Sequence, residues 1–342
     1  MKDYVTHVAH KDFEQAMRNK FGDRYAEYRT KWTLAGMGKL LPEFPLHLDI
    51  ETIDACNLRC KMCGATYTGR SYDTMTDSVF RAIIDEGAEN GLYAVGFGYC
   101  SESLMDKTLV DKIHYARDKG IMDLRLTTNG LLLNDAKMTG YTSNVKDLLE
   151  SGLTFLSVSI DAATPETYKL IRHHDLAWLE ETVDILMARR KGDLPIIRVS
   201  FCCMPVNVHE ADAFVKKWID RVDYIDIQRY TDVEVFLAIH NGKTVKSKPA
   251  EGFFCYQPWQ RLSIAANTKI APCCTFLGRE IEPLGTAGKD SIQSAWQSPR
   301  MNHIREMLAK RAFSGICQAC AGSWRTLWEE KEVVGCDTAS QS

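Results

Sequence analysis

The chain lacks an excess of charge of either sign. Its 342 residues include 42 lysines and arginines against 45 aspartates and glutamates, which gives a formal net charge of -3. Proteins that bind nucleic acid normally concentrate basic residues on one face or in one tail. We therefore expect no nucleic-acid partner.

Long apolar runs are lacking too. No stretch approaches the roughly 18 consecutive apolar residues of a membrane-spanning helix, and the start, Met1-Lys-Asp-Tyr-Val-Thr-His7, is not the basic segment and apolar run of a secretory signal. We expect a cytoplasmic protein with no membrane partner. In that reducing compartment the 12 cysteines are not expected to form disulfides, so those with ligand-like spacing are predicted to bind a metal or a cluster.

What is present is enough apolar sequence for a large core. Hydrophobic residues make up 45% of the chain and charged residues 25%, which suggests one big domain and a smaller one. Residues 10–35 place aromatic residues three or four apart, which predicts an amphipathic helix interrupted near Gly22. From residue 44 to about residue 230, short apolar runs alternate with helical patterns, which is typical of βα units and a parallel sheet. The predicted strands lie near residues 46–52, 93–97, 123–128, 153–160, 196–202 and 223–228.

Three cysteines follow the first predicted strand with the spacing C-x-x-x-C-x-x-C, at Cys56, Cys60 and Cys63. A structural zinc site fills all four positions with protein ligands. A 4Fe-4S cluster held by three cysteines instead leaves one iron open for a substrate or cofactor. The spacing therefore indicates a catalytic metal centre.

The run Cys-Asn-Leu-Arg-Cys-Lys-Met-Cys at residues 56–63 resembles the signature of the radical S-adenosylmethionine (radical SAM) superfamily, including a bulky residue, Met62, before the third cysteine. The resemblance implies that Cys56, Cys60 and Cys63 hold a 4Fe-4S cluster whose open iron binds S-adenosylmethionine, with Met62 beside the cofactor. It also implies reductive cleavage of that cofactor to a 5′-deoxyadenosyl radical, which takes a hydrogen atom from the substrate.

Further motifs follow the later predicted strands, at the carboxyl edge where parallel α/β folds place their sites. Residues 96–105 are similar to the Gly-Gly-Glu-Pro segment of the family, with Cys100 and Ser101 for the glycines and Ser103 for the proline. The resemblance implies that Glu102 holds the methionine amino group, since a buried carboxylate is the natural partner of an ammonium.

Residues 127–130 and 157–161 also look like radical SAM strand ends, which implies that Asn129, Ser159 and Asp161 bind the cofactor, with Ser159 and Asp161 near its ribose or carboxylate. From the residues alone, a turn and a helix N-cap before Thr164-Pro165 explain them equally well. Arg172 is expected either to pair with the methionine carboxylate or to be a solvated helical arginine.

A second group of cysteines lies near the C-terminus, at Cys255, Cys273-Cys274 and Cys317-x-x-Cys320. Four such ligands can close a tetrahedral site, which zinc and a fully ligated 4Fe-4S cluster both accept. The segment resembles the SPASM and twitch extensions of radical SAM enzymes. Because Cys336 alone follows Cys320, the resemblance implies a twitch-type domain with one auxiliary 4Fe-4S cluster. By analogy its ligands are Cys255, Cys273 rather than Cys274, Cys317 and Cys320.

Two more cysteines, Cys202 and Cys203, lie on the fifth predicted strand. Alternation along a strand directs one side chain to the interior of a barrel and the other to the helix layer. Either thiol can be a small buried hydrophobe or the donor that returns a hydrogen atom to a substrate radical, as an epimerase requires.

The expected fold is α/β, a partial (β/α)6 TIM-like barrel with a small C-terminal twitch or SPASM-like domain. We divide the chain into an N-terminal helical extension at residues 1–43, the radical SAM barrel at 44–235, the auxiliary-cluster domain at 250–325 and a C-terminal tail at 326–342.

The expected function is that of a radical SAM oxidoreductase which oxidises an alcohol, or epimerises a centre, in a carbohydrate-like small molecule of a biosynthetic pathway. A flavodoxin or ferredoxin is the expected electron donor. Two alternatives stay open, a maturase of a ribosomally made peptide and a non-catalytic iron–sulfur protein. About 43 residues before the first strand are short for the winged-helix domain with which peptide maturases commonly bind a leader, which favours a small molecule.

Overall fold

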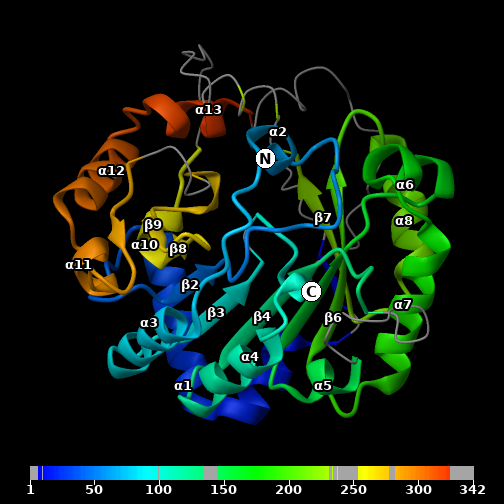
Figure 1. Ribbon diagram of the computed structural model, residues 1–342, viewed down its shortest axis with the longest axis horizontal. Helices are drawn as coiled ribbons and strands as arrows, with labels where there is room; N and C mark the ends of the chain where they lie inside the picture. The colour runs from blue at the N-terminus through cyan, green and yellow to red at the C-terminus, as the bar shows by residue number, and fades with distance from the viewer. Residues whose placement is uncertain are drawn as a thin grey trace.

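The structure, a computed structural model, describes residues 7–9, 11–98, 100–133, 145–230, 253–276 and 282–323, together with Val233 and Leu237. Within them, ten strands form one curved sheet in the order β1-β7-β6-β5-β4-β3-β2-β8-β9-β10. The strands from β7 to β8 in that order are parallel, and the outer pairings are antiparallel. Figure 1 shows the parallel strands at the centre of the molecule, flanked by helices. The predicted α/β barrel is confirmed.

All six predicted strands are present, namely β2 (His47–Ile50), β3 (Ala94–Phe97), β4 (Asp123–Thr128), β5 (Phe155–Ser159), β6 (Ile196–Cys203) and β7 (Tyr224–Arg229). Four others were not predicted, namely β1 (His7–Ala9), β8 (Arg261–Ile264), β9 (Lys269–Ala271) and β10 (Gly285–Thr286). Because β8 pairs in parallel with β2, the C-terminal segment continues the barrel sheet directly and lies beside the strand that precedes the first three cysteines.

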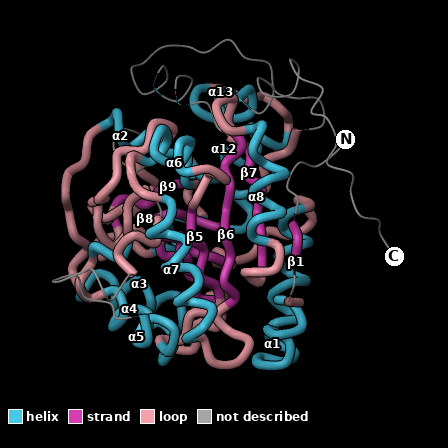
Figure 2. Tube along the Cα trace, turned by 90° about the vertical axis from the view of Figure 1, so that its right-hand side faces the viewer, coloured by secondary structure: helices cyan, strands magenta, loops and turns pink. Residues whose placement is uncertain are grey.

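The helices that connect the parallel strands cover the outside of the sheet (Figures 1 and 2). They are α3 (Asp77–Glu89), α4 (Leu109–Asp118), α5 (Val145–Glu150), α6 (Pro165–Arg172), α7 (Leu176–Arg189) and α8 (Ala211–Trp218). The short helix α2 (Gly64–Thr68) lies beyond the ends of the strands, and 3-10 turns occur at η1 (Ser103–Met105) and η2 (Val208–Glu210). The C-terminal elements are α10 (Gln257–Gln260), η3 (Cys274–Phe276), α11 (Ile292–Trp296), α12 (Pro299–Ala309) and α13 (Gly315–Ser323). No described helix has the length and apolar character to cross a membrane.

The N-terminal helix α1 (Phe13–Gly36) closes the amino end of the barrel. Its Tyr28 ring stacks on Tyr93, just before β3, with ring centroids 5.2 Å apart, and Phe13 meets Phe155 of β5 edge to face at 5.3 Å. Gly22 breaks the helix with a φ of 56°, as its position in the aromatic stripe predicts. With this end filled by aromatic packing, the carboxyl ends of the strands are left to build the site.

Partly buried ion pairs lie between neighbouring positions of the barrel strands. Arg261 of β8 lies 3.3 Å from Asp49 of β2, and the guanidinium of Arg198 lies 2.7 Å from Asp226 of the neighbouring β7. Within β4, Arg125 lies 2.7 Å from Asp123, two residues away. Asp123 and Arg125 can pair because side chains two apart along a strand lie on the same face of the sheet. Pairing lowers the cost of removing each charge from water.

Candidate active site

The first three cysteines lie on the loop that follows β2, and all three line one open cavity of about 410 Å³ at the carboxyl ends of the strands. The loop turns tightly, because the Cys63 N–H donates to the carbonyl of Cys60 at 3.1 Å. The Leu58 N–H donates to the Cys56 sulfur at 3.4 Å. The volume is within the range of small-molecule sites.

The chemistry of these thiols fits a metal cluster. Burial raises the pKa of Cys60 to about 11, although Arg172 acts in the opposite sense, so without a metal the thiol keeps its proton at neutral pH. Metal ions deprotonate a coordinating thiol outright. Three cysteines on one cavity wall, with open space in front of them, match a cluster that lacks a fourth protein ligand.

Glu102 lies on the wall of the same cavity and is almost wholly buried. One carboxylate oxygen accepts from the Thr128 hydroxyl at 2.7 Å and from the Leu104 N–H at 3.1 Å, and the other accepts from the Asn129 N–H at 2.7 Å. Burial raises the pKa of Glu102, against the lowering effect of these donors. Because a carboxylate offers about four acceptor positions, one remains for a further donor such as an ammonium.

Asn129 connects this edge of the cavity to the loop after β2 that carries Cys56, Cys60 and Cys63, here called the cluster loop. Its side-chain amide donates to Asn57 at 2.8 Å, and Glu102 donates its own N–H to the carbonyl of Ala55 at 2.8 Å. Both Asn129 and Ser159 line the cavity, as does Met62. The loops after β2, β3 and β4 therefore form one hydrogen-bonded unit around the cysteines.

Arg172 is buried, so the prediction of a solvated helical arginine is wrong. It ends α6 with its side chain turned into the cavity wall, where its Nε donates to Asp161 at 2.9 Å and its Nη1 to the Cys60 sulfur at 3.8 Å. Asp161 also accepts from the Cys202 N–H at 2.7 Å. Asp161 is not the helix cap either, because Thr164 caps α6 by accepting from the Thr167 N–H.

The two cysteines of β6 diverge as alternation predicts. Cys203 packs against the core beneath the outer helices, on the same side as Phe201. Cys202 therefore faces the interior of the barrel.

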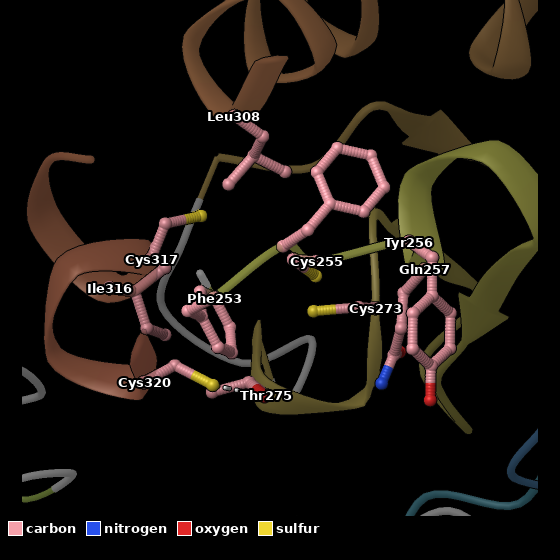
Figure 3. Close-up of a pocket in the computed structure, with 11 residues that line it drawn as sticks. Phe253, Cys255, Tyr256, Gln257, Cys273, Thr275, Leu308, Ile316, Cys317 and Cys320 are labelled. Atoms are coloured by element: carbon pink, nitrogen blue, oxygen red, sulfur yellow. Dashed lines mark hydrogen bonds between the residues drawn. The ribbon is translucent and has the colours of Figure 1, made fainter. Parts of the chain in front are cut away.

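The second group of cysteines also lies around one cavity. Figure 3 shows the sulfurs of Cys255, Cys273, Cys317 and Cys320 directed into it from three separate segments of the chain. Burial raises the pKa of Cys255 to about 11 and that of Cys317 to about 12. These thiols also stay protonated unless a metal binds them.

The adjacent pair Cys273-Cys274 separates at the start of η3. Cys273 lines the cavity of the second cysteine group, whereas Cys274 lines the cavity of the first group. Thr275, the next residue, lines both cavities. The two cavities are therefore neighbours with a shared wall, which the spacing of the cysteines along the sequence does not reveal.

Arg70 was also missed by the sequence reasoning. Its buried guanidinium donates to Asp54 at 3.2 Å and to the carbonyl of Cys100 at 3.1 Å, so it fastens the loop after β3 to the start of the cluster loop. The sequence feature that could have pointed to this arginine is Asp54, a carboxylate two residues before the first cysteine, which needs a cationic partner if it is buried.

Cys336 lies outside the described residues.

The chain is similar to known proteins in family, sequence and structure. Residues 50–227 match the family described as the radical SAM superfamily, and residues 255–321 match SPASM, described as an iron-sulfur cluster-binding domain. The first match spans more than half of the chain.

Among curated relatives, a GTP 3',8-cyclase of Alkaliphilus metalliredigens is 32% identical over 187 residues, 53% of this chain and 54% of that protein. A 7,8-dihydro-6-hydroxymethylpterin dimethyltransferase of Methanocaldococcus jannaschii is 24% identical over 180 residues, 52% of this chain and 34% of that protein. The chain spans about half the length of the cyclases it matches.

Solved structures share the fold at low identity. Streptococcus suis SuiB bound to precursor peptide SuiA has a TM-score of 0.63 and 15% identity, over 89% of this chain and 76% of that one. BtrN in complex with AdoMet and 2-DOIA has a TM-score of 0.53 and 14% identity, over 80% and 91%.

Proposed function

The chain belongs to the radical SAM superfamily and carries a SPASM-type domain, and on that premise we propose that it oxidises an alcohol of a neutral, carbohydrate-like small molecule to a carbonyl. Membership makes it a radical SAM enzyme and confirms the predicted cofactor classes: a 4Fe-4S cluster, S-adenosylmethionine and an auxiliary iron–sulfur centre. The substrate class, the reaction and the residue roles below are the proposal.

One observation carries the proposal: the cavity of the second cysteine group adjoins the cavity of the first, with Thr275 in the wall of both. A substrate held against the cluster loop would then be separated from the auxiliary centre by the wall that contains Thr275. Such a neighbour can take the electron that remains after hydrogen abstraction and proton loss.

The second cysteine group supports electron transfer over substrate binding. Its four sulfurs point into one cavity, and as the four ligands of a 4Fe-4S cluster they would leave no position for a substrate. Residues 255–321 match a domain described as iron-sulfur cluster-binding. This favours a cluster over zinc.

The charges around the first cavity favour a neutral substrate. Of the described residues that line it, Arg70 and Arg172 are cationic, and each is committed to a buried aspartate, Asp54 and Asp161 respectively. A nucleoside triphosphate such as GTP needs several cations that are free to pair with phosphate. A polyol needs hydroxyl and amide partners, which Thr127 and Ser159 can supply.

We assign the residues as follows. Cys56, Cys60 and Cys63 hold the catalytic cluster, and Glu102 accepts from the methionine ammonium with its remaining lone pair. Met62 and Ser159 contact the nucleoside, and Asn129 holds the wall in place. Arg172 positions Cys60 and Asp161. When bound, cluster and cofactor supply a 5′-deoxyadenosyl radical that abstracts a hydrogen atom. Cys255, Cys273, Cys317 and Cys320 hold the auxiliary cluster, and Cys274 faces the substrate.

Two readings of the chemistry compete with this one. Epimerisation needs a hydrogen-atom donor, and the inward direction of Cys202 makes it the candidate of the β6 pair. Modification of a peptide is favoured by the similarity to SuiB, which was solved with a precursor peptide and covers 89% of this chain. At 15% identity that similarity concerns the fold.

The test is anaerobic reconstitution with iron and sulfide, followed by reduction with S-adenosylmethionine and a panel of polyols, aminocyclitols and peptides. We expect 5′-deoxyadenosine together with a carbonyl product. Cys60→Ala should form neither. Cys317→Ala should still cleave the cofactor but form no product, and full turnover by this variant would contradict the electron-acceptor role. Incorporation of solvent deuterium without oxidation would indicate an epimerase.

A further inference from the structure

The wall between the two cavities has a polar group in it. Thr275 lies in η3, next to Cys274. Cys274 lines the cavity of the first three cysteines (the cluster-loop cavity), whereas Thr275 lines both that cavity and the cavity of the second cysteine group. Its Oγ1 lies 3.9 Å from the sulfur of Cys320, and Figure 3 marks this contact with a dashed line. The hydroxyl is thus beside a proposed cluster ligand and at the edge of the proposed substrate site.

The direction of this hydrogen bond follows from the chemistry of the sulfur. In the free thiol, either atom can be the donor. A cysteine bound to iron is a thiolate and has no proton to give, so the Thr275 hydroxyl must then donate. Hydrogen bonds to the ligand sulfurs are among the features that set the reduction potential of an iron–sulfur cluster, because they stabilise the extra negative charge of its reduced state.

We propose that Thr275 is a positioning residue that tunes the auxiliary cluster through Cys320, so that this cluster can accept the electron released in the substrate cavity. The proposal rests on the proposed function, because it takes Cys320 as a ligand and the neighbouring cavity as the substrate site.

The electron balance of the step is complete. The carbinol C–H bond breaks and its hydrogen atom ends in 5′-deoxyadenosine. The substrate radical would then lose its O–H proton to water at the open side of the cavity and one electron to the auxiliary cluster. A C=O bond forms, the substrate is oxidised by two electrons in all, and the auxiliary cluster is reduced by one.

The experiment is a redox titration of the reconstituted holoenzyme, followed by electron paramagnetic resonance. Thr275→Val keeps the shape of the side chain but removes the donor. We expect the midpoint potential of the auxiliary cluster to become more negative. The equilibrium constant for reduction of the cluster should fall by on the order of fivefold, the effect of losing one net hydrogen bond. Thr275→Ser, which keeps a hydroxyl, should restore most of the potential.

A matched control removes a hydroxyl from the other cavity alone. Thr127 lines the cluster-loop cavity, so Thr127→Val should leave the auxiliary potential unchanged. An unchanged potential in Thr275→Val, with the auxiliary signal present, would overturn the proposal. Should that variant lose its cluster, the unmodified holoenzyme decides: an exchangeable proton coupled to the auxiliary cluster, lost in deuterium oxide and in Thr275→Ala, supports the proposal, and no such proton in the unmodified protein overturns it.

Failure of the proposed function is a separate outcome. If Cys320→Ala keeps a full auxiliary signal, Cys320 is not a ligand and the assignment of the second cysteine group fails. If Cys320→Ala loses that signal but Thr275→Val leaves the midpoint potential of the auxiliary cluster unchanged, the ligand set stands and the tuning role alone is wrong.

Discussion

The guanidinium of Arg172 donates to the sulfur of Cys60 across 3.8 Å, from the last residue of α6 to the middle of the cluster loop. A backbone bond runs beside it, from the Lys61 N–H to the carbonyl of Ile171 at 3.3 Å. Asp161 holds the other edge of the guanidinium. The cluster loop is thus fixed by a helix that lies more than a hundred residues further along the chain.

Replacement of Arg172 by methionine should destabilise the protein strongly, because it leaves the buried Asp161 carboxylate without its cation. Removal of one partner of a buried pair typically costs about 3–5 kcal/mol. Anaerobic urea unfolding measures this loss. The double variant Arg172→Met with Asp161→Asn should recover much of it, and equal instability of the two variants would show that the pair is not the reason.

Glu102→Gln should weaken S-adenosylmethionine binding while both clusters remain. The amide keeps the size of the side chain but loses the charge that an ammonium prefers. Since a charge-assisted hydrogen bond contributes about 1.5–3 kcal/mol, we expect roughly 10- to 150-fold weaker binding, measured by titration of the cluster spectrum. Unaltered affinity would remove Glu102 from the cofactor site.

The adjacent cysteines should differ in their effect on iron content. Cys273→Ala should lose about four iron atoms per chain, one cluster, because its sulfur lines the cavity of the second cysteine group. Cys274→Ala should keep the full iron content but lose substrate turnover, because its thiol lines the other cavity. Iron and sulfide analysis of the two variants checks this, and the reverse pattern would exchange their roles.

His47 should make stability fall on the acid side. Its Nε2 lies 3.0 Å from Asp49, but burial lowers the pKa of His47, and the effect of Asp49 is not enough to reverse this. The unfolded chain then takes up a proton below about pH 6.5 while the folded protein does not. Stability should therefore be constant above that pH and decrease below it, by up to about 1.4 kcal/mol per pH unit.

The matched variant for this prediction is His47→Gln, whose amide can still donate to Asp49 but cannot titrate. Urea midpoints at pH 7 and pH 5 should fall less in this variant than in the unmodified protein. The same fall in both would show that another group controls the acid limb.

The sequence predicted the six barrel strands because short apolar runs with turn residues between them are a local signal, and β4 was predicted with its observed bounds of Asp123–Thr128. The short strand β8 has no such signal. It forms because Arg261–Ile264 finds the free edge of β2, a pairing across more than two hundred residues that no local pattern encodes.

The site shows the same contrast between residues that a local pattern identifies and contacts that only the fold creates. Spacing and resemblance identified the cysteines and Glu102, whereas the partners of Arg172 depend on the distance between α6 and the cluster loop. From the sequence, a solvated helical arginine is one expectation for Arg172, because the pairing with Asp161 exists only in the folded protein. The separation of Cys273 from Cys274 likewise depends on the turn at η3, and the shared wall at Thr275 on the packing of two distant segments.

The most direct test of the account is the electron paramagnetic resonance spectrum of the reduced protein, fully reconstituted with iron and sulfide, with and without S-adenosylmethionine. We predict two cluster signals, one of which shifts when the cofactor binds, and loss of the shifting signal alone in Cys60→Ala. A spectrum that the cofactor leaves unchanged would contradict an open iron at Cys56, Cys60 and Cys63, and with it the proposed chemistry.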